Sequence, residues 1–180
     1  MLIEYREIKV AHDDIDVLSD FNLEVNEGEK VLIYGKSGMG KSTILKLLLG
    51  FAHPDNGEIY FEGRELDKKS VWEVRKRVAY VSQDLDIAEG RVSDFVDSVL
   101  SYKANSQLEG DGERMEEALG LLELDMSILN KQMTDISGGE KQRIALTVAI
   151  LLRRDIFLLD EVTSAVDPEM KVKIVDYFNS

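Results

Sequence analysis

A glycine-rich segment of the chain has the residue types and spacing needed to bind phosphate. Residues 35–42 read G-K-S-G-M-G-K-S, which fits the pattern G-x-x-x-x-G-K-[ST]. Glycines allow backbone N–H groups to turn towards phosphate oxygens, and a helix that starts there adds the positive end of its dipole. Lys41 would then reach the β- and γ-phosphates of a nucleotide, and the hydroxyl of Ser42 would bind Mg²⁺. The nucleotide-binding residues predicted in this way are Gly35, Lys36, Ser37, Gly38, Met39, Gly40, Lys41, Ser42 and Thr43.

Two adjacent carboxylates form a second candidate site. The apolar run Ile156–Leu159 ends in Asp160 and Glu161. A strand of this kind beside the strand that precedes the phosphate loop would place Asp160 near Mg²⁺. Glu161 would then face the γ-phosphate and orient or deprotonate the attacking water. Taken alone, the same residues also fit a strand followed by a solvated acidic turn.

The segment Ser137-Gly138-Gly139-Glu140 precedes a long helical run. Ser137 and Glu140 have the spacing of a capping box, in which each side chain binds the backbone N–H of the other residue. Two glycines in a first helical turn cost about 1 kcal/mol each relative to alanine, so capping alone does not explain them. Their missing side chains let another group approach the helix N-terminus, and an anion is the natural candidate. Both interpretations remain open at this level.

The elements that must hold these residues indicate an α/β fold. Unbroken apolar runs at 31–34, 78–81 and 156–159 predict strands of a mostly parallel sheet that is buried on both faces. Alternating residues at 21–25 and 59–61 predict half-exposed antiparallel strands in an N-terminal β subdomain. Residues 84–135 show helical spacing, interrupted by a polar loop at 104–112, and this predicts an inserted helical subdomain.

In this order, the motifs resemble the nucleotide-binding domain of ATP-binding cassette (ABC) proteins, which have a P-loop NTPase core. Gln83 resembles the glutamine of the family's Q-loop, and residues 137–140 resemble its signature motif. Asp160 and Glu161 match the Walker B motif, and residues 164–167 resemble the D-loop. The resemblance covers nearly the whole chain. It implies one domain over 1–180, with the ATPase core at 1–83 and 136–180 and the helical subdomain at 84–135.

This resemblance implies that two chains, as a homodimer or heterodimer, enclose two molecules of MgATP. Each phosphate loop would face Ser137, Gly139 and Glu140 of the other chain. Gln83 would contact the Mg²⁺ or the water, so the metal-binding set is Ser42, Gln83 and Asp160, and the catalytic set is Glu161, Lys41 and Gln83.

Adenine recognition is a separate expectation from the resemblance. The family stacks an aromatic side chain on adenine, and His12 falls at that position, with Tyr5 as a less favoured substitute. The alternative for His12 is an exposed loop residue beside Asp13 and Asp14.

Two departures from the family pattern affect these expectations. Glu140 stands where the signature usually has glutamine, which preserves capping. After the D-loop the family has a further strand, beside the phosphate-loop strand, and a histidine that contacts the γ-phosphate. Here the sequence stops at Ser180, and the histidines are His12 and His53. We therefore expect a chain that is shortened, naturally or by truncation, and a strand at 31–34 that lacks a neighbour.

Composition narrows the class of protein. The formal net charge is −13, from 22 Lys and Arg against 35 Asp and Glu, and this acidity argues against binding to duplex nucleic acid. Cysteine is absent, which excludes disulfides and thiolate chemistry. The longest apolar run covers only 144–152, too short to cross a bilayer. We expect a cytoplasmic protein, peripheral on the cytoplasmic face of the membrane.

The leading interpretation is the ATP-hydrolysing subunit of an ABC transporter that energises a separate membrane-spanning subunit. Residues 83–95 show a resemblance to exporter-type members, whereas the transported substrate leaves no signal in this chain. Two alternatives remain. One is a nucleotide-binding module without turnover, and the other is a soluble ABC ATPase that takes no part in transport.

Overall fold

The computed structural model describes residues 1–13, 15–83, 90–108 and 112–179. Two compact units make up the chain, Met1–Arg77 and Val78–Ser180, and each is described by itself. The first unit contains the phosphate loop, and the second contains the acidic pair and the serine-glycine segment. The predicted boundaries at 83 and 136 do not coincide with this division, and the single-domain organisation stays a prediction.

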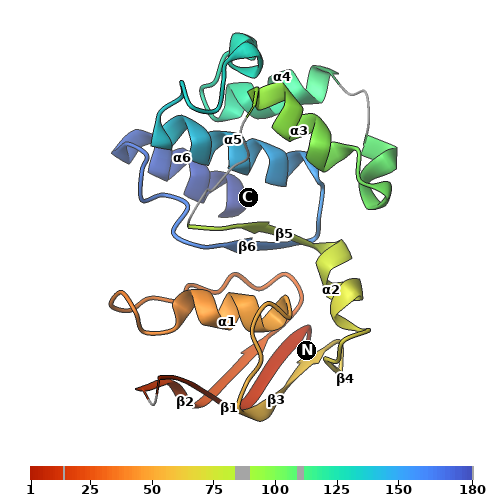
Figure 1. Ribbon diagram of the computed structural model, residues 1–180, viewed down its shortest axis with the longest axis vertical. Helices are drawn as coiled ribbons and strands as arrows, with labels where there is room; N and C mark the ends of the chain where they lie inside the picture. Colours follow the sequence, from red (N-terminus) through yellow and green to blue (C-terminus); the bar gives the residue numbers. More distant parts are fainter. Residues whose placement is uncertain (14, 84–89, 109–111, 180) are drawn as a thin grey trace. The chain divides into compact units, whose positions relative to one another are not determined.

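An antiparallel sheet with the strand order β2-β1-β3-β4 forms the base of the first unit (Figure 1). Its strands are β1 (Ile3–His12), β2 (Ile15–Val25), β3 (Asn56–Phe61) and β4 (Arg64–Glu65). The predicted strands at 21–25 and 59–61 lie within β2 and β3, and both pair with β1. The predicted antiparallel β region is therefore confirmed.

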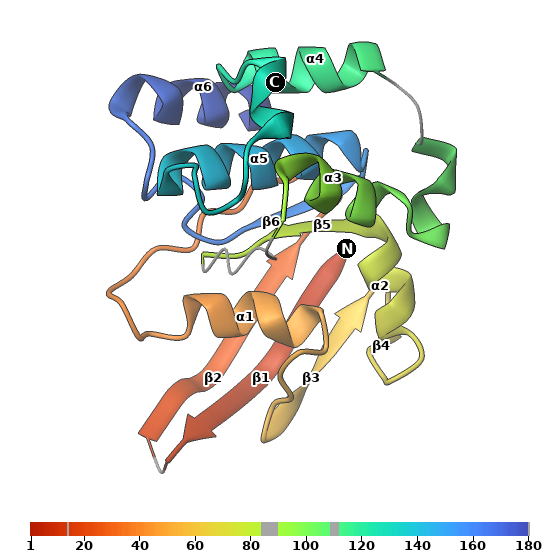
Figure 2. The same cartoon turned by 45° about the horizontal axis from the view of Figure 1, so that its top comes forward.

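Helix α1 (Lys41–Leu48) lies over one face of this sheet (Figures 1 and 2). Its residues Ile44, Leu47 and Leu48 are buried, and each contributes about 1.5–3 kcal/mol through the hydrophobic effect. A buried hydrogen bond joins the two layers, because the hydroxyl of Tyr5 donates to the carbonyl of Ile44 at 2.8 Å. The unit ends with a second helix, α2 (Val71–Arg77).

The strand predicted at 31–34 is wrong, because residues 29–35 contain neither strand nor helix. Leu32 is 84% exposed and Tyr34 is 89% exposed, so this apolar run does not contribute to the core. None of the strands in the described residues pairs with it. A strand needs neighbouring strands to satisfy its backbone donors and acceptors, and an apolar run alone does not supply them.

In the second unit, β5 (Val78–Val81) and β6 (Ile156–Leu159) form a parallel pair at the predicted positions. The long segment between them provides the crossover that parallel strands require. Val81 pairs with Leu159, so both strands reach the same edge of the sheet at their carboxyl ends. The residues that follow each strand are consequently brought together.

Helices of the second unit lie on one side of β5 and β6 (Figures 1 and 2). They are α3 (Val92–Leu100), α4 (Gly112–Leu121), α5 (Gly138–Leu151) and α6 (Pro168–Asn179), with short 3₁₀ helices η1 (Lys103–Leu108) and η2 (Met126–Asn130). Most of the described part of 84–135 is thus helical, as predicted. The expected loop at 104–112 is wrong in its first half, where η1 stands, and residues 109–111 lie outside the described residues.

Helix α5 is the central element of this unit because it contacts two apolar clusters. Ala145, Leu146 and Ala149 pack in a cluster with residues of β5 and α6. Ile144 and Val148 pack in a second cluster with residues of α3, α4 and η2. Burial on both sides fixes the position of the N-terminus of α5, where the serine-glycine segment lies.

Candidate functional site

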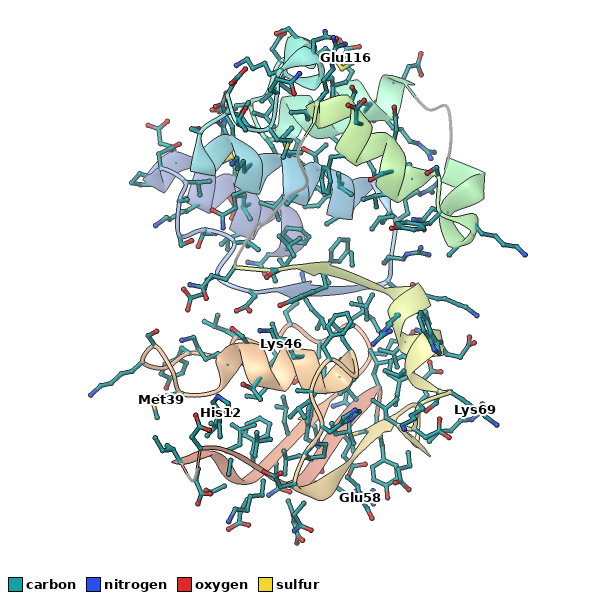
Figure 3. All side chains as sticks on the ribbon, viewed as in Figure 1. His12, Met39, Lys46, Glu58, Lys69 and Glu116 are labelled. Carbon is teal, nitrogen blue, oxygen red and sulfur yellow. The ribbon has the colours of Figure 1, made fainter. Side chains whose placement is uncertain are left out.

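The phosphate loop leads directly into α1 (Figure 3). Gly40 is the N-cap of this helix and has a φ of 81°, in the left-handed region that favours glycine. A Cβ atom at this position would also lie 3.0 Å from side-chain carbons of Val17 and Leu18. Glycine is therefore required at position 40 both by backbone conformation and by the close approach of β2.

The N-terminus of α1 lacks a side-chain cap. Its N-cap provides no side-chain hydrogen bond, and its first turn contains no acidic residue. The first N–H groups of such a helix need acceptors, and an anion can supply them. The Nζ atom of Lys41 donates to the carbonyl of Gly35 at 3.1 Å and to that of Lys36 at 3.2 Å. The loop therefore combines N–H donors, a dipole and an ammonium group, as the sequence predicts for a phosphate site.

His12 and Tyr5 occupy very different environments. His12 is the last residue of β1, its side chain is 84% exposed, and its Nε2 lies 3.7 Å from Oδ2 of Asp13 (Figure 3). Stacking of His12 on adenine stays a prediction, and Asp14 lies outside the described residues. The prediction that Tyr5 could stack on adenine in place of His12 is wrong, because the Tyr5 side chain is buried in the core and makes an edge contact with Phe21. Burial also raises the pKa of Tyr5.

The two acids after β6 differ sharply in exposure. Asp160 is only 4% exposed. Its backbone N–H donates to the carbonyl of Val81 at 3.0 Å, and the hydroxyl of Tyr80 lies 3.5 Å from its Oδ2. Glu161 is exposed and has a φ of 50°, which is uncommon for a residue with a side chain. The structure thus provides one buried carboxylate held by its neighbours and one carboxylate that faces outward.

Gln83 lies two residues after the end of β5, and Asp160 directly follows β6, so both come after the carboxyl ends of the parallel pair. Gln83 is exposed, and residues 84–89, the next part of the predicted Q-loop and exporter-like segment, lie outside the described residues. Ser42, the other predicted metal ligand, belongs to the first unit.

The buried carboxylate of Asp160 suits a Mg²⁺ ion that arrives with a nucleotide. No group of three or more His, Cys, Asp or Glu side chains within the described parts of the chain could hold a metal ion by itself. Mg²⁺ bound to nucleotides typically uses one or two protein carboxylates together with the phosphates and water. The carboxylate of Asp160, in the second unit, matches that pattern.

The predicted capping box at the start of α5 is confirmed. Oγ of Ser137 accepts a hydrogen bond from the N–H of Glu140 at 3.2 Å, and Oε2 of Glu140 accepts one from the N–H of Ser137 at 2.8 Å. The second bond lowers the pKa of Glu140, because it favours the charged carboxylate. Glutamate at this position therefore preserves the cap, as expected.

The two glycines of this segment have different surroundings. A Cβ atom at Gly139 would lie 2.7 Å from the carbonyl oxygen of Ala165, whereas one at Gly138 would meet nothing within 4 Å. Glycine at position 139 is therefore explained by a contact within the chain, and this contact could not be predicted from the sequence. The open space at Gly138 leaves room for a group from outside the chain.

Two further residues were missed by sequence reasoning. Tyr80 contacts Asp160, and Gln142 of α5 hydrogen-bonds to both Glu161 and Ala165. Gln142 is only 2% exposed, but it lies between Lys141 and Arg143 in the sequence, so its neighbours gave no signal of burial.

Comparisons with curated proteins agree with these motifs. Residues 18–164 match the family described as ABC transporter. The energy-coupling factor transporter ATP-binding protein EcfA1 of Oceanobacillus iheyensis is 32% identical over 99% of this chain and 65% of its own length. EcfA1 of Enterococcus faecalis is 33% identical over 97% of this chain and 63% of its own length. The chain thus spans less than two thirds of the length of these relatives.

Solved structures share the fold. The ATP-binding cassette MJ0796, a dimer in a post-hydrolysis state bound to ADP and Pi, is 27% identical with a TM-score of 0.81 over 97% of this chain and 80% of that chain. A putative ABC transporter ATP-binding protein from Pyrococcus furiosus has a TM-score of 0.81 over 99% of this chain and 84% of that chain; at 23% identity this likeness shows the fold alone. These likenesses confirm the predicted α/β fold with its antiparallel and parallel sheets.

Proposed function

Because this chain belongs to the ABC transporter family, we propose that it binds and hydrolyses ATP and so energises a separate membrane subunit. The observation that carries the proposal is the phosphate loop, whose helix N-terminus lacks a cap and whose Lys41 bonds to the loop carbonyls. Lys41 would exchange these carbonyls for phosphate oxygens when a nucleotide enters. ADP and Pi in a 27% identical cassette support this assignment.

The reaction we propose is in-line attack of water on the γ-phosphate of MgATP. Ser42 and Asp160 would hold the Mg²⁺, with Gln83 beside it, and the metal would neutralise charge on the phosphates. Glu161 would orient the water and accept its proton, because its carboxylate is exposed next to the buried Asp160.

Two chains would complete each site. Ser137 and Gly139 of one chain would face the γ-phosphate bound to the phosphate loop of the other, with Glu140 holding the cap. The open space around Gly138 supports an approach of this kind. Stabilisation of the developing charge would then come from Lys41 on one side and from the signature segment on the other.

The partner in the membrane follows from the relatives, which are named as ATP-binding proteins of energy-coupling factor transporters. Among the described residues, none of the helices is long and apolar enough to cross a membrane. From the names of these relatives we place the chain at the cytoplasmic face, bound to a separate membrane-spanning subunit. The helices between β5 and α5 are the proposed docking element.

Paired substitutions test the ATPase assignment. Lys41→Ala should weaken binding of MgATP about 10- to 100-fold, since it removes charged hydrogen bonds to phosphate. Lys46→Ala is the matched control, because Lys46 lies in the last turn of the same helix and should leave binding unchanged. Glu161→Gln should retain binding and slow the release of phosphate at least about 100-fold. The matched control there is Glu169→Gln in α6.

Phosphate release should be measured with MgATP in excess over a range of protein concentrations. Turnover per chain that rises with concentration is the expected result for a site built from two chains. Bound nucleotide without turnover would replace the proposal by the alternative of a binding module. Normal turnover in Glu161→Gln would show that the base is another residue.

A further inference from the structure

We propose that Gln142 is a positioning residue for Glu161, an inference that rests on the ATPase function proposed above. Gln142 lies in the second turn of α5, two residues beyond the capping box. It does not reach solvent, because it is only 2% exposed. Its role is to hold the turn that carries the Glu161 carboxylate.

One amide group spans both ends of this turn. The Nε2 atom of Gln142 donates to the carbonyl of Glu161 at 3.1 Å, and its Oε1 atom accepts from the N–H of Ala165 at 3.1 Å. Both functions of the amide are therefore used on backbone groups. A buried amide with both partners in place rigidifies its surroundings, whereas the loss of either partner leaves a polar group unsatisfied.

The turn needs such support because Glu161 has a φ of 50°. A left-handed conformation is costly for a residue with a side chain, and it persists where the surrounding structure holds it. The carbonyl of Glu161 accepts a second hydrogen bond, from the N–H of Ser164 at 3.0 Å. These two bonds fix the peptide plane that follows Glu161, and this plane helps to set the direction of its carboxylate.

The contact between α5 and the turn continues at Gly139, where a Cβ atom would lie 2.7 Å from the carbonyl of Ala165. The helix backbone therefore lies directly against the turn. Asp160 has support of its own, from Val81 and Tyr80, and does not depend on Gln142. Loss of the Gln142 amide should therefore disturb Glu161 and leave Asp160 in place.

Gln142→Met removes the amide while retaining a side chain of similar length. We expect kcat for ATP hydrolysis to fall about 10-fold, with KM changed less than about 2-fold, because the base is misaligned while the nucleotide site stays intact. The matched control is Thr147→Val, which removes a buried hydrogen bond within α5 to the carbonyl of Arg143. This control should leave kcat unchanged even if it lowers stability.

A double-mutant cycle separates positioning from a general structural role. In the Glu161→Gln background, Gln142→Met should cause no further loss of turnover, because the base that it positions is already absent. An equal fold loss in both backgrounds would overturn the proposal. So would a normal kcat in Gln142→Met alone.

Amide hydrogen exchange at Ala165 provides a readout that does not require turnover. Exchange of this N–H, followed by NMR in the full chain, should be about 10-fold faster in Gln142→Met and unchanged in Thr147→Val. Unchanged exchange in Gln142→Met would show that the Gln142 amide does not hold the turn from Glu161 to Ala165. If the unsubstituted chain lacked turnover while exchange at Ala165 was faster in Gln142→Met, the ATPase proposal would be refuted. The role of the Gln142 amide in holding the turn would still be supported.

Discussion

Gly139→Ala should destabilise the second unit, whereas Gly138→Ala should not. The added Cβ at position 139 would lie 2.7 Å from the carbonyl oxygen of Ala165, and ordinary contact begins at 3.4 Å. The turn or the helix must therefore move by about 0.7 Å. Overpacking of this kind costs about 1–3 kcal/mol, and here the obstacle is backbone rather than a flexible side chain.

Gly138→Ala is the internal standard for this prediction, because both glycines lie in the first turn of α5. Each substitution gains up to about 1 kcal/mol of helix propensity, and this gain cancels when the two variants are compared. A Cβ at position 138 would meet nothing within 4 Å. The difference in the free energy of unfolding between the variants should therefore be about 1–3 kcal/mol, with Gly139→Ala the less stable.

Urea unfolding followed by circular dichroism measures this difference, with the midpoint and the slope fitted for both variants. Equal slopes are needed for the comparison, since a changed slope indicates a changed native or denatured state. Equal stability of the two variants, or a more stable Gly139→Ala, would show that the close approach of Ala165 is not a constraint. Loss of turnover in a fully stable Gly138→Ala would instead indicate that the added methyl group obstructs the approach of the other chain's nucleotide.

Four further predictions concern the free energy of unfolding. Tyr5→Phe should cost about 1 kcal/mol in urea unfolding, because it removes the buried hydrogen bond to α1; an unchanged midpoint would contradict this. Asn105→Ala should cost about 1–3 kcal/mol by the same assay, because this buried side chain bonds to the guanidinium of Arg154, and a neutral result would show that water replaces it. Ser137→Ala should cost about 1 kcal/mol through loss of the cap. The pKa of Glu140 is lowered in the folded state, so the stabilisation by its carboxylate is present above pH 4.5 and is lost as the pH falls below that value. In Glu140→Gln, the free energy of unfolding should depend less on pH in this range, as measured by urea unfolding at a series of pH values.

Local signals predicted much of the fold. The parallel strands at 78–81 and 156–159, the helix after the phosphate loop and the capping box at residue 137 all occur as expected. Each of these elements is specified by a few neighbouring residues, and the interactions that form it lie among those residues. The apolar run at 31–34 has the same local pattern and forms no strand, because a strand also depends on partners that its own residues do not specify.

The missed residues share a different property. Gln142 binds backbone groups of Glu161 and Ala165, which lie 19 and 23 positions further along the chain. No spacing rule within a helix connects such positions, so the sequence shows only a polar residue. The same holds for Tyr5, whose ring suits adenine by type but whose hydroxyl bonds to a helix 39 positions away. Side-chain chemistry could be predicted in both cases, but the partner could not.

The most direct test of the central claim is complementation between two inactive variants. Lys41→Ala removes the phosphate-binding ammonium group, and Gly138→Asp places a charged side chain in the open space that the other chain's phosphates would enter. Neither chain should hydrolyse ATP alone. An equal mixture should recover about one quarter of normal phosphate release, because half of randomly formed dimers are mixed and each holds one intact site. A mixture as inactive as its components would contradict a site shared between two chains.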